Sequence, residues 1–171
     1  FFKGGRMTGT HYDHSSLGII YDAFGERLLI DAGPSSYQED TLEIGKHLMS
    51  SFAHNTVSVS QQSQVIHRGT DLTDMQIIND ALWYTSDTFD VAKDDYVNGY
   101  AKEVMEIWDQ IKDTTSVIHE RTVINDKENT LTLVVDDMLT KGEYQYEQNW
   151  NFAYKFADYG SVICDADERF I

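Results

Sequence analysis

The sequence predicts an all-β protein, an antiparallel β-sandwich with at most one or two short helices, on three observations. Apolar and polar residues alternate with period two in several segments, most clearly at 55–60 and 130–135. Segments rich in turn-forming residues separate these runs, as at 125–129 and 140–142. The chain contains a single proline, which suits long antiparallel strands because proline removes a ladder hydrogen-bond donor.

The elements follow from these patterns in chain order. Segments 17–21 and 27–31 are expected to form a hairpin around the glycine-containing connection 22–26. Further strands are expected at 55–60, 74–78, 81–85, 116–124, 130–135 and 143–152. Two segments, 38–49 and 104–111, have apolar spacings that fit a short helix, although strand residues could produce the second. We find no internal repeat, so residues 1–171 are expected to form one sandwich domain.

Composition excludes several classes of protein. Hydrophobic residues make up 41% of the chain and aromatics 12%, enough to bury a core. A net charge of −16 argues against nucleic acid or an anionic membrane as a partner, and no apolar run is long enough to span a bilayer. One cysteine, Cys164, allows no internal disulfide. The chain opens on Phe1 without an initiator methionine, so we expect a piece of a larger protein with any secretion signal upstream.

The residues best suited to chemistry gather near the start of the chain. His11, Asp13 and His14 fall within four residues, Asp31 ends a predicted strand, and His54 begins another. Imidazole nitrogen and carboxylate oxygen are the donors that zinc takes. Asp13 could bind metal or orient a histidine, or it could simply form a turn. The whole set could also be surface loop residues.

The order of these motifs resembles the heparinase II/III-like family of polysaccharide lyases. The matching segments are HYDH at 11–14, LGIIY at 17–21, LLIDAG at 28–33, AHNTV at 53–57, IHERTV at 118–123, LVVDD at 133–137 and YEQNW at 146–150. The resemblance covers most of the chain and implies a supersandwich-like β domain downstream of an α/α toroid. It implies a lyase that cleaves acidic, uronic-acid-containing polysaccharides or oligosaccharides by β-elimination, in the periplasm or outside the cell.

The resemblance also assigns roles. Asp31 and His54 match the family's metal ligands, and zinc would be structural. The third ligand is open: His14 fits one alignment, with His11 as the catalytic histidine that reaches the substrate. In the reverse alignment His11 binds metal, and Gly9 occupies the catalytic position. We take His11 as catalytic and His14 as ligand. The family's tyrosine and asparagine come from the toroid, so this chain alone is expected to be inactive.

Two other classes of function remain open. One is a non-catalytic glycan-binding or structural sandwich with a stabilising metal site. The other is a cupin-like metal enzyme, and the absence of the glutamate expected in a cupin site argues against this class. A face left uncovered by the toroid would favour a homo-oligomer. Aromatic strand residues such as Trp83 and Trp150 are expected to pack in the core or on a sheet face. His119 and Arg121 share a strand face and are expected to form a surface charge pair.

Overall fold

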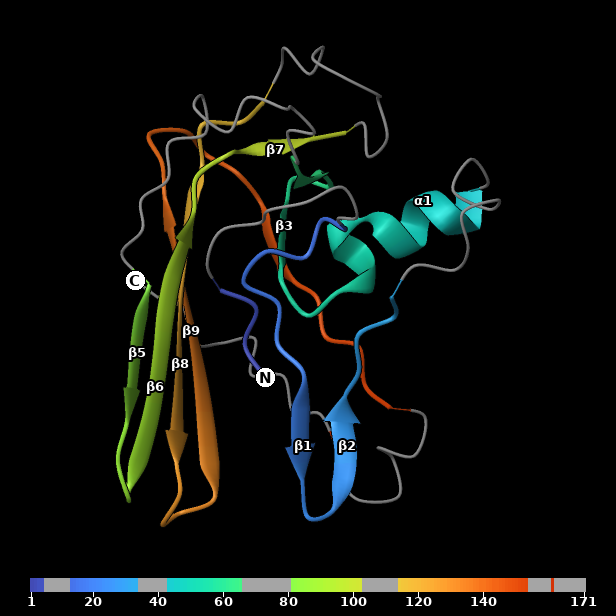
Figure 1. Cartoon of the computed structure of the whole chain (residues 1–171). Coiled ribbons are helices and arrows are strands. Elements are labelled where there is room, and N and C mark those ends of the chain that lie inside the picture. The colour runs from blue at the N-terminus through green and yellow to red at the C-terminus, as the bar shows by residue number, and fades with distance from the viewer. Residues whose placement is uncertain (5–12, 34–42, 66–80, 103–113, 154–160, 162–171) are drawn as a thin grey trace, which may run out of the picture.

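The computed structural model describes residues 1–4, 13–33, 43–65, 81–102, 114–153 and 161 (Figure 1). One α-helix, one 3-10 helix and ten strands lie in these ranges. In chain order they are β1 (Tyr21–Ala23), β2 (Glu26–Leu29), α1 (Glu43–Met49), η1 (Ser51–Ala53), β3 (Val57–Val59), β4 (Ser63–Gln64), β5 (Leu82–Thr85), β6 (Phe89–Tyr96), β7 (Tyr100–Ala101), β8 (Ile118–Asp126), β9 (Leu131–Leu139) and β10 (Tyr146–Gln148).

The strands form two layers. A four-stranded antiparallel sheet, ordered β5-β6-β8-β9, makes one layer, at the left of Figure 1. Three two-stranded pairs, β1-β2, β3-β10 and β4-β7, are also antiparallel. Figure 1 shows β1, β2, β3 and α1 to the right of the four-stranded sheet. This arrangement confirms the predicted all-β sandwich. Among the described residues, no helix is long and apolar enough to cross a bilayer.

The core lies between the layers. Register places Ala92 and Tyr96 on the same face of the four-stranded sheet, because alternate residues point the same way. On this inward face Tyr96 packs with Tyr100 and Val117 against Leu17, Val57 and Val59 of the other layer, and all six are buried. The opposite face of the sheet exposes an apolar row on β9, comprising Leu131, Leu133, Val135 and Leu139.

The first hairpin is tighter than the sequence suggested. The predicted connection was 22–26, but β1 and β2 pair as far as Ala23 and Glu26, so only Phe24 and Gly25 form the turn. Both residues have positive φ, 56° and 79°, as a two-residue type I′ turn requires. Helix α1 occupies the second half of the predicted helix 38–49. Segments 74–78 and 104–111 lie outside the described residues.

The expectation of a surface pair at His119 and Arg121 is wrong. Both side chains are fully buried on the inward face of β8. Arg121 Nε and Nη2 donate to the two oxygens of Asp136 on β9, at 2.6 and 2.9 Å. His119 Nε2 lies 2.7 Å from the same carboxylate. A buried arginine needs a paired carboxylate to offset its lost hydration, and Asp136 supplies it.

Candidate metal centre

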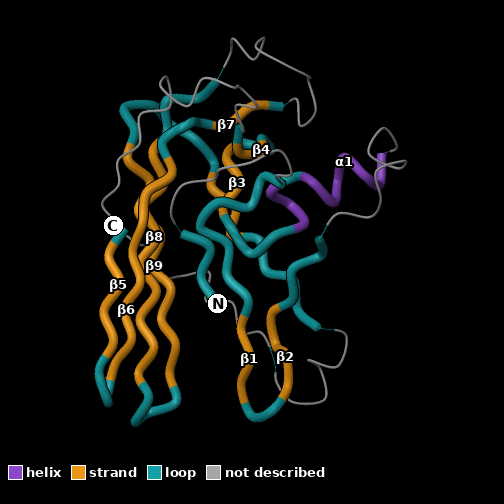
Figure 2. The backbone as a smooth tube through the Cα atoms, in the orientation of Figure 1, coloured by secondary structure: helices purple, strands orange, loops and turns teal. Residues whose placement is uncertain are grey.

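Three loop segments carry the candidate site. Residues 13–18, 30–33 and 54–56 are irregular, and they lie before β1, after β2 and before β3 (Figure 2). Asn55 fixes these segments to one another. Its fully buried amide nitrogen donates to the carbonyls of Ile19 and Ile30, at 2.8 and 2.7 Å. Its amide oxygen accepts from the backbone N–H of Asn151 at 2.6 Å. One side chain therefore positions the ends of the segments that bear Asp13, Asp31 and His54.

Asp13, Asp31 and His54 come together at this junction. One ligand atom from each lies within 4.8 Å of the others. His54 Nδ1 lies 3.1 Å from Asp31 Oδ1, and His54 Nε2 lies 3.8 Å from Asp13 Oδ2. The imidazole is fully buried, and its Nε2 makes no hydrogen bond to any described residue. A buried ring nitrogen left without a partner beside a carboxylate is the arrangement a cation would complete.

Lys3 sets the charge of this cluster. Its Nζ donates to Asp13 Oδ1 at 2.5 Å, and Ser15 Oγ donates to the same oxygen. Burial raises the pKa of Asp13, but these hydrogen bonds and the lysine charge outweigh it, so the pKa lies below its ordinary value. Burial likewise raises the pKa of Asp31, and the hydrogen bond from His54 brings it below normal. Both carboxylates are therefore ionised at neutral pH and able to bind a cation.

The other predicted ligand, His14, lies outside this cluster. It is buried, and its Nδ1 contacts the backbone carbonyl oxygen of Gln64. Its backbone is held by hydrogen bonds to Met49 and Ser51. A ring N–H bonded to a carbonyl is also how proteins orient metal-binding histidines through the other nitrogen. A ligand role for His14 therefore stays a prediction, and the catalytic role of His11 falls outside the described residues.

Sequence reasoning identified two of the three cluster members as ligands and left the role of Asp13 open. The HYDH spacing was the available signal, since it puts a carboxylate directly beside two histidines. Lys3 was missed. It is ten residues from Asp13, and the start of the chain lies alongside this loop through the bridge between Phe2 and Ile19 and the backbone hydrogen bonds that flank it.

Comparison with known families agrees with this architecture. The family model described as "Heparinase II/III-like, C-terminal" matches residues 3–169, nearly the whole chain. No curated protein matches the chain. The matched range contains both sandwich layers and the Asp13/Asp31/His54 cluster. The chain belongs to the heparinase II/III-like C-terminal family.

Proposed function

We propose that the protein is a polysaccharide lyase that cleaves uronic-acid-containing polysaccharides by β-elimination, and that this chain forms its sandwich. Family membership is the observation that carries the proposal. An N-terminal α/α toroid would supply the remaining catalytic groups, and the enzyme would act in the periplasm or outside the cell. The net charge of −16 repels an acidic polymer, so the cations that bind it would lie largely on the toroid.

The chemistry needs two proton transfers. A base takes the proton from C5 of the uronate, the C4–O4 bond breaks, a C4=C5 double bond forms, and the leaving oxygen takes a proton. We assign His11 to one of these transfers, because an imidazole can give or take a proton near neutral pH. His11 lies two residues before Asp13 in the sequence, so the cluster would anchor the segment that bears it.

We further propose that Asp13, Asp31 and His54 hold a zinc ion. One buried imidazole nitrogen without a partner and two ionised carboxylates fit the donors that zinc prefers. His54 is fully buried and both carboxylates are largely covered, which favours a structural ion over one open to substrate. Such an ion would cross-link three loop segments and fix the start of the sandwich.

The activity test uses the full-length protein. Heparan sulfate, alginate and hyaluronan are each incubated with it, and the ultraviolet absorbance of the unsaturated uronate is followed. We expect one polymer to give a rising absorbance, and His11→Ala to abolish it without changing the thermal midpoint. Full-length protein that is silent on every uronate polymer would contradict the lyase proposal.

The metal test is separate. Protein purified without chelator is analysed for metal, and we expect about one zinc per chain in the wild type and none in His54→Ala or Asp13→Asn. His47→Ala is the matched control, because His47 is exposed on α1. The variant His14→Ala tests whether His14 is also a ligand: loss of zinc in this variant would add His14 to the ligand set. Retention of zinc in His54→Ala would contradict the site itself.

A non-catalytic glycan-binding or structural sandwich is the second candidate. The burial of His54 favours it, because an ion at that depth stabilises the fold and need not meet a substrate. Stoichiometric zinc together with a full-length protein that is inactive on all uronate polymers would select this candidate.

A further inference from the structure

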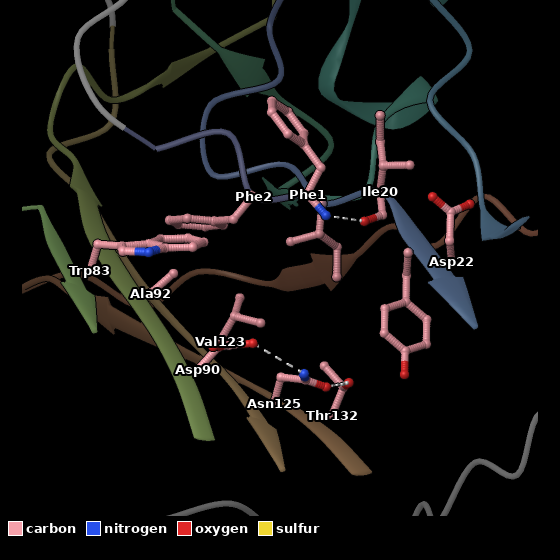
Figure 3. Close-up of a pocket in the computed structure, with 12 residues that line it drawn as sticks. Phe1, Phe2, Ile20, Asp22, Trp83, Asp90, Ala92, Val123, Asn125 and Thr132 are labelled. Atoms are coloured by element: carbon pink, nitrogen blue, oxygen red, sulfur yellow. Dashed lines mark hydrogen bonds between the residues drawn. The ribbon is translucent and has the colours of Figure 1, made fainter. Parts of the chain in front are cut away.

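A pocket of about 400 Å³ opens between the inward face of the four-stranded sheet and the start of the chain (Figure 3). It lies near β1 and is lined by both apolar and polar side chains, among them Phe2, Tyr21, Trp83, Asp90, Asn125 and Thr132. Its volume falls within the range of about 300–1,000 Å³ usual for small-molecule sites. None of its lining residues belongs to the Asp13/Asp31/His54 cluster.

A polar row crosses the sheet at the pocket. Register places Thr85 opposite Asp90, Asp90 opposite Asn125, and Asn125 opposite Thr132, one residue from each of the four strands. Thr132 Oγ1 donates to Asn125 Oδ1 at 3.0 Å, and Asn125 Nδ2 lies 3.5 Å from Asp90 Oδ2 (Figure 3). The row presents hydroxyl, amide and carboxylate groups in fixed order, which suits a ligand with several hydroxyl groups.

An apolar row lies beside it on the same face. Trp83 is opposite Ala92, and Ala92 is opposite Val123. Trp83 points to the inward face of the sandwich, yet 67% of its surface is exposed. Elsewhere this face forms the core, but here the indole is exposed and is available to a ligand. Aromatic faces next to hydrogen-bonding groups suit sugars, whose rings have an apolar C–H face and a rim of hydroxyl groups.

The charges of the pocket decide which kind of sugar it suits. Asp90 is paired with Lys127 at 2.8 Å, and Asp22 with Arg27 at 2.7 Å, so both carboxylates of the lining already have cationic partners. No lysine, arginine or histidine is among the described residues that line the pocket. The described lining side chains therefore offer a uronate or sulfate no cationic partner, within a chain of net charge −16.

We propose that this pocket binds a neutral saccharide, with Trp83 stacking on one sugar ring and the Asp90–Asn125–Thr132 row accepting and donating hydrogen bonds to its hydroxyl groups. The site would hold a glycan chain on the sandwich apart from the candidate metal centre. It does not depend on lyase activity, because β-elimination requires a uronate and the ligand here carries none.

The test is a titration of the purified full-length protein with neutral gluco-, manno-, galacto- and xylo-oligosaccharides, and with an oligouronate of similar length. Isothermal calorimetry and tryptophan fluorescence report binding. We expect saturable binding of at least one neutral series, weakened about tenfold by Trp83→Ala, as loss of about 1.4 kcal/mol of aromatic contact requires. Thr132→Val, a separate variant that removes one hydroxyl group of the polar row, should also weaken saccharide binding.

Tyr84→Ala is the matched control. Tyr84 neighbours Trp83 on β5, is 55% exposed, and points to the opposite face of the sheet, so its loss should leave binding unchanged. Trp83 and Tyr84 are both exposed, so neither substitution should unfold the protein. Absence of saturable binding by every neutral series, equal weakening by Tyr84→Ala, or oligouronate binding that Trp83→Ala weakens as strongly as neutral-sugar binding would each overturn the proposal.

Discussion

Replacing Asp136 with asparagine should lower the free energy of unfolding by about 3–5 kcal/mol, the usual cost of breaking a buried ion pair from one side. The Asp136 side chain is only 6% exposed and accepts from Arg121 twice. It also accepts from Gln148 at 2.6 Å and from His119 at 2.7 Å. An asparagine there keeps one acceptor oxygen, turns an NH2 group toward other donors, and leaves the buried guanidinium without a counter-charge.

Urea unfolding followed by circular dichroism measures this loss. The control is Lys93→Gln, which removes the partly exposed ion pair with Glu120 on the opposite face of the same sheet and should change stability little. Arg121→Met with Asp136→Leu should be less destabilised than the sum of the two single variants, since neither then leaves an unpaired charge. A loss below about 1 kcal/mol for Asp136→Asn would refute the reasoning.

The stability of the fold should also depend on pH through Asp136. Burial raises the pKa of Asp136, but hydrogen bonds and charge from Arg121 and His119 outweigh it and hold the pKa well below the ordinary 3.8. Because the folded-state value is depressed, the unfolded chain binds the proton more readily. The stabilisation is therefore complete above about pH 4–5 and is lost progressively as the pH falls further. The Asp136→Asn variant should lack this part of the acid transition.

Three further substitutions test other parts of the fold by the same urea unfolding. Asn55→Ala removes a buried amide that satisfies three backbone groups and should cost about 3 kcal/mol or more, with loss of zinc as a second readout. Gly99→Ala places a Cβ 2.3 Å from the carbonyl oxygen of Thr115, and Gly99 has φ +76°. Gly25 has φ +79° but open space around it, so Gly99→Ala should lower the free energy of unfolding more than Gly25→Ala does. Equal losses would contradict this reasoning. Burial and Glu120 raise the pKa of Asp95, so Asp95→Asn should slightly stabilise the protein at pH 7; this gain should fade as the pH falls through the raised pKa and be gone at the ordinary value of 3.8.

The alternation at 130–135 predicted its strand well, whereas the alternating run 55–60 contains only the three-residue β3, whose residues are all buried. Strand β9 contains the predicted 130–135 run almost entirely and alternates exposed and covered residues along its whole length. Strand β6 was missed, although it is central to the four-stranded sheet. Its sequence FDVAKDDY is rich in charge, which argues against a strand. Partners distant in sequence, Lys127 for Asp90 and Glu120 for Lys93, make those charges tolerable.

Only the part of the candidate site that follows from the order and spacing of motifs in the sequence could be predicted. Asp31 and His54 follow from motif order, and their contact at 3.1 Å agrees with it. The pocket was not predictable, because the sequence suggests that Trp83 packs in the sandwich. Only the register shows which face it occupies, and on that face 67% of its surface is exposed. The burial of Arg121 was also hidden, since its pairing with Asp136 depends on the register of β8 and β9.

The buried arginine has a consequence for the candidate metal centre. Arg121 Nη1 donates to the carbonyl oxygens of Leu17 and Asn55, at 2.9 and 2.6 Å, so its charge is shared between the two layers. Asn55 in turn holds the carbonyl of Ile30, next to Asp31, and adjoins His54 along the chain. An apolar residue could fill the volume of Arg121, but it could not bind two carbonyls at once. The four-stranded sheet thus orients, through one guanidinium, the loops that carry Asp13, Asp31 and His54.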